Sequence, residues 1–255
     1  MISETRFPNL SNIEHIAKAV LPYIHNFHDM RLFTDHGYSH SLRVMKYIEK
    51  LIEIYDHSSE PLNTAEQHIL RCSCWLHDLG CISEREKHAK KSVKIIRTLT
   101  EKGILDLEPI KAEIEYVIYT HSSKGLPIDD VPECANITGF EDRVRVKLLC
   151  ALFRLADECD IDKMRAPKVI FDLLEDEMTH DSKLWWRGHS NIIGVYFSDK
   201  KIQIVLKDSD SESEGKRVAA SLISTVEDLK PILREYHFPY TKCELILQKS
   251  VDIDE

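Results

Sequence analysis

Long hydrophobic runs are missing from this sequence of 255 residues. No apolar stretch approaches the roughly 18 residues that a helix needs to cross a bilayer. The N-terminal segment, residues 1–15, has no apolar core of the kind that a signal peptide requires. These absences argue against a membrane partner and against secretion, and we therefore expect a cytoplasmic location.

A surplus of positive charge is also missing. The chain has 34 Lys and Arg residues against 43 Asp and Glu residues, which gives a net charge of -9. Binding along duplex nucleic acid needs clustered basic residues, so the acidic balance argues against such a partner. A small phosphorylated metabolite or nucleotide stays open as a partner, because bound cations reverse the local sign of the charge. Homo-oligomer formation also stays open.

The seven cysteines show neither a disulfide pattern nor zinc-finger spacing. Their number is odd, and they are scattered through segments that are expected to be helical. Cys72 and Cys74 are separated by one residue, which fits neither a CxxC redox pair nor a zinc knuckle. We therefore expect reduced thiols in the core of an intracellular protein.

Apolar residues recur with helical spacing through the first two thirds of the chain, and β-branched residues dominate after residue 185. The spacing predicts helices over about 12–29, 39–57, 64–79, 86–102, 109–121 and 141–160, then strands over 192–197 and 202–206, a helix over about 216–236 and a third strand over 243–247. The predicted fold class is mainly α, with a helical bundle over residues 1–183. A small α+β cap or assembly subdomain is expected over residues 184–255.

Histidine and aspartate residues recur at the ends or on the inward faces of the predicted helices. They are His40, His77, Asp78, His88, His121 and Asp157. Imidazole and carboxylate groups bind divalent manganese, iron and zinc. His88 alone has the alternative of a solvated first-turn residue, and His121 alone that of a satisfied core histidine. A buried unpaired carboxylate is costly, which makes Asp157 harder to explain without a partner. Together the six residues predict a metal-dependent enzyme.

The arrangement of the six residues along the chain favours two ions. Neighbouring residues on a helix point about 100° apart, so His77 and Asp78 can join one cluster only at a helix end. Gly80 supplies that end. A first metal would take His40, His77, Asp78 and Asp157, and Asp78 would bridge to a second metal held by His88 and His121. Two ions roughly 3.5–4 Å apart can clamp a phosphoryl group and activate water.

The ordered pattern H…HD…H…H…D resembles the HD-domain superfamily of metal-dependent phosphohydrolases. It begins with His40 in HSLRV and ends with Asp157 in RLADECD, so the match covers roughly residues 36–160. The resemblance implies an HD-domain helical bundle, and the two additional histidines match the two-metal branch. That branch includes cyclic-dinucleotide and dinucleoside-polyphosphate hydrolases. Ser122 stands where several relatives carry a further histidine, and the GYP motif of the cyclic-di-GMP branch is absent from the sequence.

Four residues are predicted to take part in catalysis. Asp78 would act as the metal bridge. Lys124, in HSSKG beyond a ligand helix, and Arg154, one turn before Asp157, are candidate phosphate contacts. His36 is a candidate general acid or substrate-orienting residue. Ordinary alternatives stay open: a polar turn for Lys124, pairing with a ligand carboxylate for Arg154 and loop capping for His36.

The leading hypothesis is metal-dependent hydrolysis of a phosphoester or phosphoanhydride in a nucleotide-like substrate, of the phosphodiesterase or nucleotidase type. The expected cofactor is a pair of divalent transition-metal ions, Mn²⁺ or Fe²⁺, with Mg²⁺, Ni²⁺, Co²⁺ and Zn²⁺ as alternatives. The same resemblance includes di-iron oxygenases that activate O₂, which gives a second hypothesis. A third hypothesis is a regulatory or scaffolding HD protein without catalysis.

Overall fold

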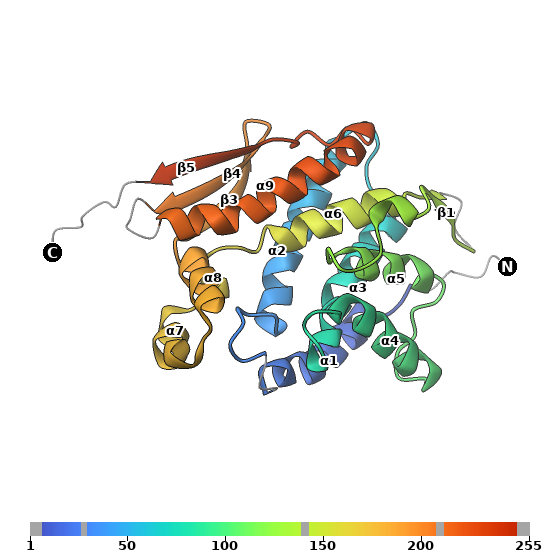
Figure 1. The fold of residues 1–255 in the computed structure, drawn as a ribbon. Coiled ribbons are helices and arrows are strands. Elements are labelled where there is room, and N and C mark those ends of the chain that lie inside the picture. The colour runs from blue at the N-terminus through green and yellow to red at the C-terminus, as the bar shows by residue number, and fades with distance from the viewer. Residues whose placement is uncertain (1–6, 27–29, 139–142, 208–211, 249–255) are drawn as a thin grey trace. The chain divides into compact units, whose positions relative to one another are not determined.

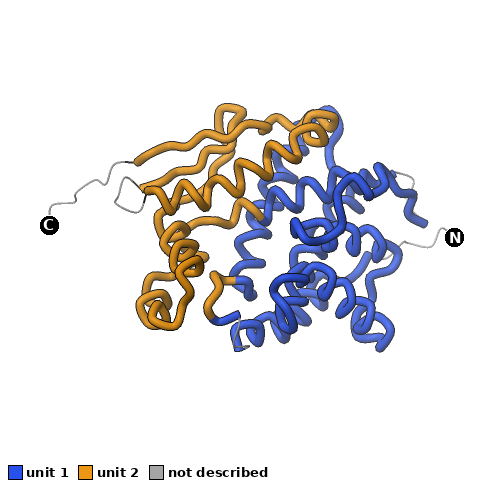
Figure 2. The backbone as a smooth tube through the Cα atoms, in the orientation of Figure 1, with its two compact units in different colours: residues 1–31, 36–157 blue, residues 32–35, 158–255 orange. Residues whose placement is uncertain are grey.

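The computed structural model describes residues 7–26, 30–138, 143–207 and 212–248. The chain divides into two compact units (Figure 2). Unit 1 comprises Met1–Arg31 and His36–Asp157, and unit 2 comprises Leu32–Asp35 and Glu158–Glu255. All six predicted metal ligands belong to unit 1. The division into a helical domain over residues 1–183 and a small α+β subdomain over residues 184–255 stays a prediction.

Unit 1 is built from helices, with one short β-ribbon. Its elements are α1 (Leu10–Val20), η1 (Leu21–Asn26), α2 (Tyr38–Asp56), α3 (Thr64–Leu76), η2 (Leu79–Ile82), α4 (His88–Glu101), α5 (Lys111–Thr120), η3 (Ile128–Asp130), β1 (Ala135–Asn136), β2 (Arg143–Val144) and α6 (Val146–Glu158). Helix α3 packs against α1, α2 and α5, and α4 packs against α5 and η2 (Figure 1). The helices predicted in this region are confirmed, with shifted ends.

The first helix is shorter than the predicted range of 12–29. It begins at Leu10 because the side chain of Asn9 caps it and accepts a hydrogen bond from the Asn12 amide at 3.2 Å. It ends at Val20 and continues as a 3-10 helix. Pro22 explains this change, since proline has no N–H and its ring crowds the preceding helical turn. Residues 27–29 lie outside the described residues.

Helix α6 is largely buried in unit 1 and carries Asp157 near its C-terminus. Its apolar residues are buried on every side: Val146, Leu148, Leu149, Cys150, Ala151, Leu152, Phe153, Leu155 and Ala156. A helix that is apolar all round belongs in a core. The predicted start near residue 141 is wrong, because Arg143 and Val144 pair with β1 as strand β2. Residues 139–142 lie outside the described residues.

A buried ion pair joins the start of α3 to the residue before α6. Glu66 is fully buried, and its Oε1 accepts hydrogen bonds from the main-chain N and the Nε of Arg145, both at 2.8 Å. Its Oε2 accepts from the Nη2 of Arg145 at 2.6 Å. Glu66 and Asn63 also form a reciprocal capping box. This network fixes the starts of two core helices of unit 1.

Unit 2 combines short helices with a three-stranded sheet. Its elements are η4 (Lys163–Arg165), α7 (Lys168–Leu174), η5 (Glu175–Glu177), α8 (His180–Ser190), β3 (Ile192–Ser198), β4 (Lys201–Lys207), α9 (Glu212–Glu235) and β5 (Cys243–Gln248). The strand order is β3-β4-β5, with β3 and β4 antiparallel and β4 and β5 parallel. Helix α9 connects β4 to β5 and packs on β4 (Figure 1). The three strands and the helix predicted after residue 185 are confirmed.

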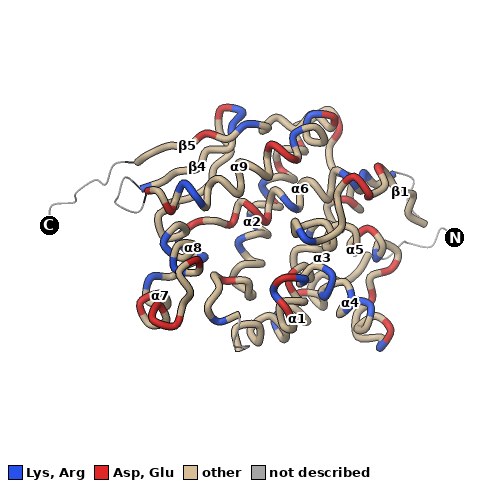
Figure 3. The backbone as a smooth tube through the Cα atoms, in the orientation of Figure 1, with Lys and Arg blue, Asp and Glu red and all other residues tan. Residues whose placement is uncertain are grey.

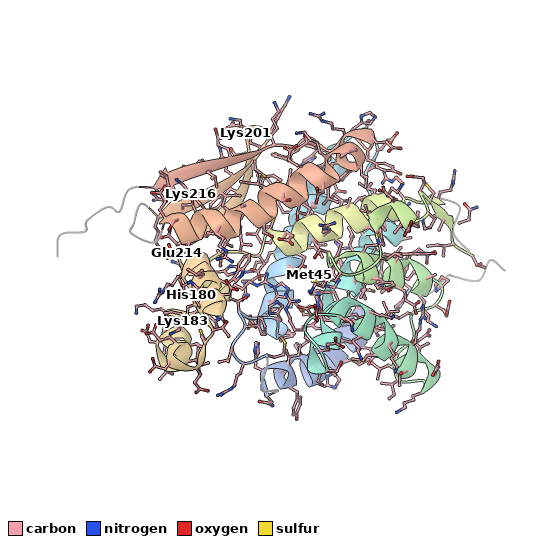
Figure 4. All side chains as sticks on the ribbon, viewed as in Figure 1. Met45, His180, Lys183, Lys201, Glu214 and Lys216 are labelled. Carbon is pink, nitrogen blue, oxygen red and sulfur yellow. The ribbon has the colours of Figure 1, made fainter. Side chains whose placement is uncertain are left out.

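A tight hairpin joins β3 to β4. The two turn residues, Asp199 and Lys200, have φ values of 51° and 58°. Positive φ at both central residues gives the two-residue turn whose twist matches that of antiparallel strands. Lys201, labelled in Figure 4, is the first residue of β4. It forms an ion pair of 2.9 Å with Glu244 on β5.

The fold class is mainly α with a small α+β region, as predicted. Acidic and basic residues both occur along the chain in each of the two units (Figure 3). Among the described residues, none of the helices combines the length and hydropathy that a membrane crossing requires.

Candidate metal centre

The adjacent residues His77 and Asp78 converge because α3 ends just before them. Helix α3 stops at Leu76, His77 caps it, and Asp78 leaves the helical conformation with φ -101° and ψ 7°. The Nε2 of His77 therefore lies 3.4 Å from the Oδ2 of Asp78. This geometry confirms the prediction that a helix end brings the two side chains together.

The first group of ligand atoms comes from α2, the end of α3 and α6. The Nε2 of His40 lies 3.1 Å from the Oδ1 of Asp157 and 3.2 Å from the Nε2 of His77. The Oδ2 of Asp78 lies 3.6 Å from the Nε2 of His40. Four potential ligand atoms thus surround one small volume.

The second group faces the other oxygen of Asp78. Its Oδ1 lies 3.4 Å from the Nε2 of His88 and 3.9 Å from the Nε2 of His121. The two histidine Nε2 atoms are 2.9 Å apart. His88 is the first residue of α4, and His121 follows the last residue of α5. Each carboxylate oxygen of Asp78 therefore faces its own pair of histidines.

The centre is closed on most sides. His40, His77, Asp78, His88 and His121 are all buried. The side chain of Asp157 keeps 17% of its surface exposed, and its partner His40 keeps 1%. The Asp157 side of the centre is thus the more open one.

Main-chain carbonyl groups fix the orientation of the buried imidazole rings. The Nδ1 of His77 lies 2.8 Å from the carbonyl oxygen of Cys74, and the Nδ1 of His121 lies 2.6 Å from that of Ile118. A carbonyl oxygen only accepts, so each Nδ1 donates its proton, and Nε2 is the ring nitrogen that faces Asp78 and can bind a metal.

Both carboxylates of the centre are ionised at neutral pH. Burial works to raise the pKa of Asp78, but the imidazoles of His77 and His88 lower it well below its usual range. Burial likewise works to raise the pKa of Asp157, and the hydrogen bond from His40 with the neighbouring imidazoles lowers it overall. The two anionic side chains are the oxygen ligands that a divalent ion needs.

The histidines of the second group are neutral at the same pH. Burial lowers the pKa of His121 to about 3, and the closeness of the His88 and His77 imidazoles further disfavours a proton on its ring. Burial also lowers the pKa of His88, against the opposing effect of Asp78. Metal binding requires neutral imidazoles and ionised carboxylates. The ligand atoms of two sets lie within 4.8 Å of one another: His40, His77 and Asp157 form one set, and His77, Asp78 and His121 the other. These His and Asp groups therefore fit a metal ion.

The three other predicted catalytic residues lie at different distances from this cluster. His36 is buried, with its ring centroid 5.8 Å from that of His40. Arg154 is partly buried on α6, three residues before Asp157 and so adjacent to it on the helix surface. Lys124 is exposed and pairs with Glu86, outside the buried cluster.

Three residues near the centre were missed by the sequence analysis. The Nη1 of Arg85 lies 2.9 Å from the Nδ1 of His88, and the Sγ of Cys81 lies 3.5 Å from the Oδ1 of Asp78. The ring of Phe153 packs against His77 at 5.4 Å between centroids. Arg85 precedes His88 by three residues, and Cys81 follows Asp78 by three. This short spacing could have marked both residues as neighbours of the ligands.

The helical fold and the buried HD pair define an HD-type domain. The family model named HD-CE matches residues 30–237, which include all six predicted ligands. The chain belongs to the HD-CE family. No curated protein matches the chain.

Proposed function

We propose that this protein is a metal-dependent phosphohydrolase that cleaves a phosphoester or phosphoanhydride of a nucleotide-like substrate. The observation that carries the proposal is the position of the Asp78 carboxylate. Its two oxygens face two separate pairs of histidines. An HD-type domain with a buried His and Asp cluster is consistent with a metal-dependent hydrolase. Two adjacent ions can clamp a phosphoryl group and activate water, which supports a phosphorylated substrate.

Two divalent transition-metal ions, Mn²⁺ or Fe²⁺, are proposed as the cofactor. His40, His77, Asp78 and Asp157 would hold the first ion, and Asp78, His88 and His121 the second. When bound, such ions lower the pKa of water and neutralise charge on phosphoryl oxygens. The protein contributes imidazoles whose orientation main-chain carbonyl groups already hold, so that little reorganisation accompanies binding.

The more open side of the centre suggests where a substrate enters. Asp157 is the most exposed of the six proposed ligands, and Arg154 stands one helical turn before it. A guanidinium group there is suited to bind phosphate oxygens in a bidentate manner. His36, buried beside His40, is suited to transfer a proton to a leaving oxygen.

Lys124 is proposed as a contact for a more distant phosphate. Its ammonium group now pairs with Glu86, and both side chains are exposed. Surface ion pairs contribute little, so a phosphate group can displace Glu86 from Lys124 at small cost. Lys124→Ala should therefore weaken substrate binding, with a higher KM and little change in kcat.

The direct test is a panel of mononucleotides, cyclic dinucleotides and dinucleoside polyphosphates, incubated with the protein and Mn²⁺. Phosphate release or cleavage of one class is expected, together with loss of activity on chelation and in Asp78→Ala. Surface variant Asp172→Ala serves as the control, since Asp172 is exposed and pairs with Lys168 on α7. The proposal fails if every substrate stays intact while the protein demonstrably holds its metal.

The same preparation separates the other two hypotheses. A di-iron oxygenase would consume O₂ in the presence of its substrate after loading with Fe²⁺. A regulatory or scaffolding protein would bind metal without turnover of any kind.

A further inference from the structure

A buried serine links the two halves of the candidate metal centre. Ser92 lies on α4, one helical turn after His88, and is fully buried. Its hydroxyl group donates a hydrogen bond to the carbonyl oxygen of His77. The hydroxyl oxygen of Ser92 in turn accepts a hydrogen bond from the Gly80 amide at 2.8 Å. One hydroxyl group thus connects both ends of the turn 77–80 to helix α4.

The turn and the helix also meet at the backbone level. A Cβ atom on Gly80 would lie 2.1 Å from the carbonyl oxygen of His88 and 2.6 Å from the amide nitrogen of Ser92. These distances are far below van der Waals contact, so only glycine permits this approach. The Ser92 hydrogen bonds therefore act across a direct backbone contact between the turn that carries Asp78 and the helix that carries His88.

We propose that Ser92 is a positioning residue, which sets the distance between Asp78 and His88 and so completes the second metal position. The inference rests on the proposed two-metal function. Ser92 does not itself contact a ligand atom of the centre. Its effect passes through the main chain of the turn, whose carbonyl and amide groups it holds.

The first metal position should depend on Ser92 far less than the second. Its proposed ligands come from α2, from α6 and from the turn itself, and none of them lies on α4. The second position needs His88 of α4 and the Oδ1 of Asp78 at a fixed separation, which is 3.4 Å between their nearest ligand atoms. If the turn and α4 separate slightly, only the second set of ligands loses its geometry.

The test is a calorimetric titration of metal-free protein with Mn²⁺, for the wild type and for Ser92→Ala. The Kd of the second ion should rise about 10- to 100-fold in the variant, as for other residues that orient metal ligands. The Kd of the first ion should stay within about twofold of the wild-type value. Ser73→Ala is the matched control, because Ser73 is a fully buried serine of α3 whose Oγ has no hydrogen-bond partner in the described structure. It should leave both Kd values unchanged.

Ser92→Cys is a milder variant that keeps the size of the side chain and a weak donor. It should give a second-ion Kd between those of the wild type and Ser92→Ala, and it carries the test if Ser92→Ala does not fold. Electron paramagnetic resonance provides a second readout, since two neighbouring Mn²⁺ ions give a coupled signal and a single ion does not. With Mn²⁺ present at one equivalent beyond the two that the sites require, we expect the wild type to give the coupled signal and Ser92→Ala to lose it.

The outcomes separate the positioning role from the proposed function. If Ser92 variants bind both ions with wild-type Kd values, the positioning role is overturned and the two-metal proposal stands. An equal loss of both ions would also overturn it, since that result describes a general structural role. If the wild type binds a single ion, the two-metal proposal itself fails.

Discussion

The Nε2 atoms of His88 and His121 lie 2.9 Å apart, although 33 residues separate them in the sequence. Helix α4 supplies one ring at its first residue, and α5 supplies the other just after its last. The Nδ1 of His121 is used by a main-chain carbonyl group, so its Nε2 has only a lone pair to offer. Because both rings belong to the proposed second metal position, removal of one of them tests that position.

His121→Ala should reduce the metal content from two ions per chain to one. The variant removes one ligand of the second position and leaves the first four ligands unchanged. Elemental analysis of protein purified without chelator measures the ratio directly. His57→Ala, at the exposed C-terminal end of α2, is a suitable control and should keep two ions. An unchanged ratio in His121→Ala would remove His121 from the centre.

Metal removal should lower the stability of the wild type. The two ionised carboxylates and the imidazoles converge in the folded state only, so a cation that binds them stabilises that state alone. Metal at about 100 times its Kd adds roughly 2.7 kcal/mol. For a chain of this length, that corresponds to an unfolding temperature about 5–10 °C higher. Asp78→Ala should show little difference with and without chelator in scanning calorimetry, and a full wild-type shift in that variant would contradict the assignment.

Glu113→Gln should stabilise the protein at neutral pH. Glu113 is buried on α5, its Oε2 lacks a hydrogen-bond partner among the described residues, and burial raises its pKa above the usual 4.5. A raised folded-state pKa means that stability falls as the pH rises from the unfolded value through the folded one. The gain from glutamine should be on the order of 1 kcal/mol at pH 7.5 and should vanish below pH 4.5. Urea unfolding at the two pH values measures it, and a gain of equal size at both would exclude the ionisation as its cause.

Arg145→Ala should destabilise the protein far more than Arg97→Ala. Removal of Arg145 leaves the buried carboxylate of Glu66 without its cation, which costs about 3–5 kcal/mol. Arg97 pairs with Glu115 with 60% of its side chain exposed, and such pairs contribute about 0–1 kcal/mol. Chemical denaturation of the two variants compares them directly. Similar losses for both would show that Glu66 is stabilised by its capping contacts alone.

Helical periodicity and ligand chemistry were enough to predict the fold class and the convergence of the six His and Asp residues. His77 and Asp78 could be placed because Gly80 marks a helix end in the sequence itself. The ends of α1 and α6 were less predictable. Asn9 and Pro22 act locally on α1, whereas the start of α6 depends on pairing between β1 and β2.

Contacts between distant segments could not be predicted in the same way. A serine inside a helix carries no pattern, so the link from Ser92 to His77 emerges only when α4 packs against the turn. The ion pair between Lys124 and Glu86 spans 38 residues and depends on how α4 and α5 pack. Helices α7 and α8 were not predicted, and α7 exposes apolar residues such as Leu173 that give no inward stripe.

The most direct test of the central claim is anomalous X-ray scattering from crystals of the protein loaded with Mn²⁺. Two peaks roughly 3.5–4 Å apart are predicted. One should lie among His40, His77 and Asp157, the other between His88 and His121, with Asp78 in contact with both. A single peak, or ions bound only outside these residues, would contradict the account.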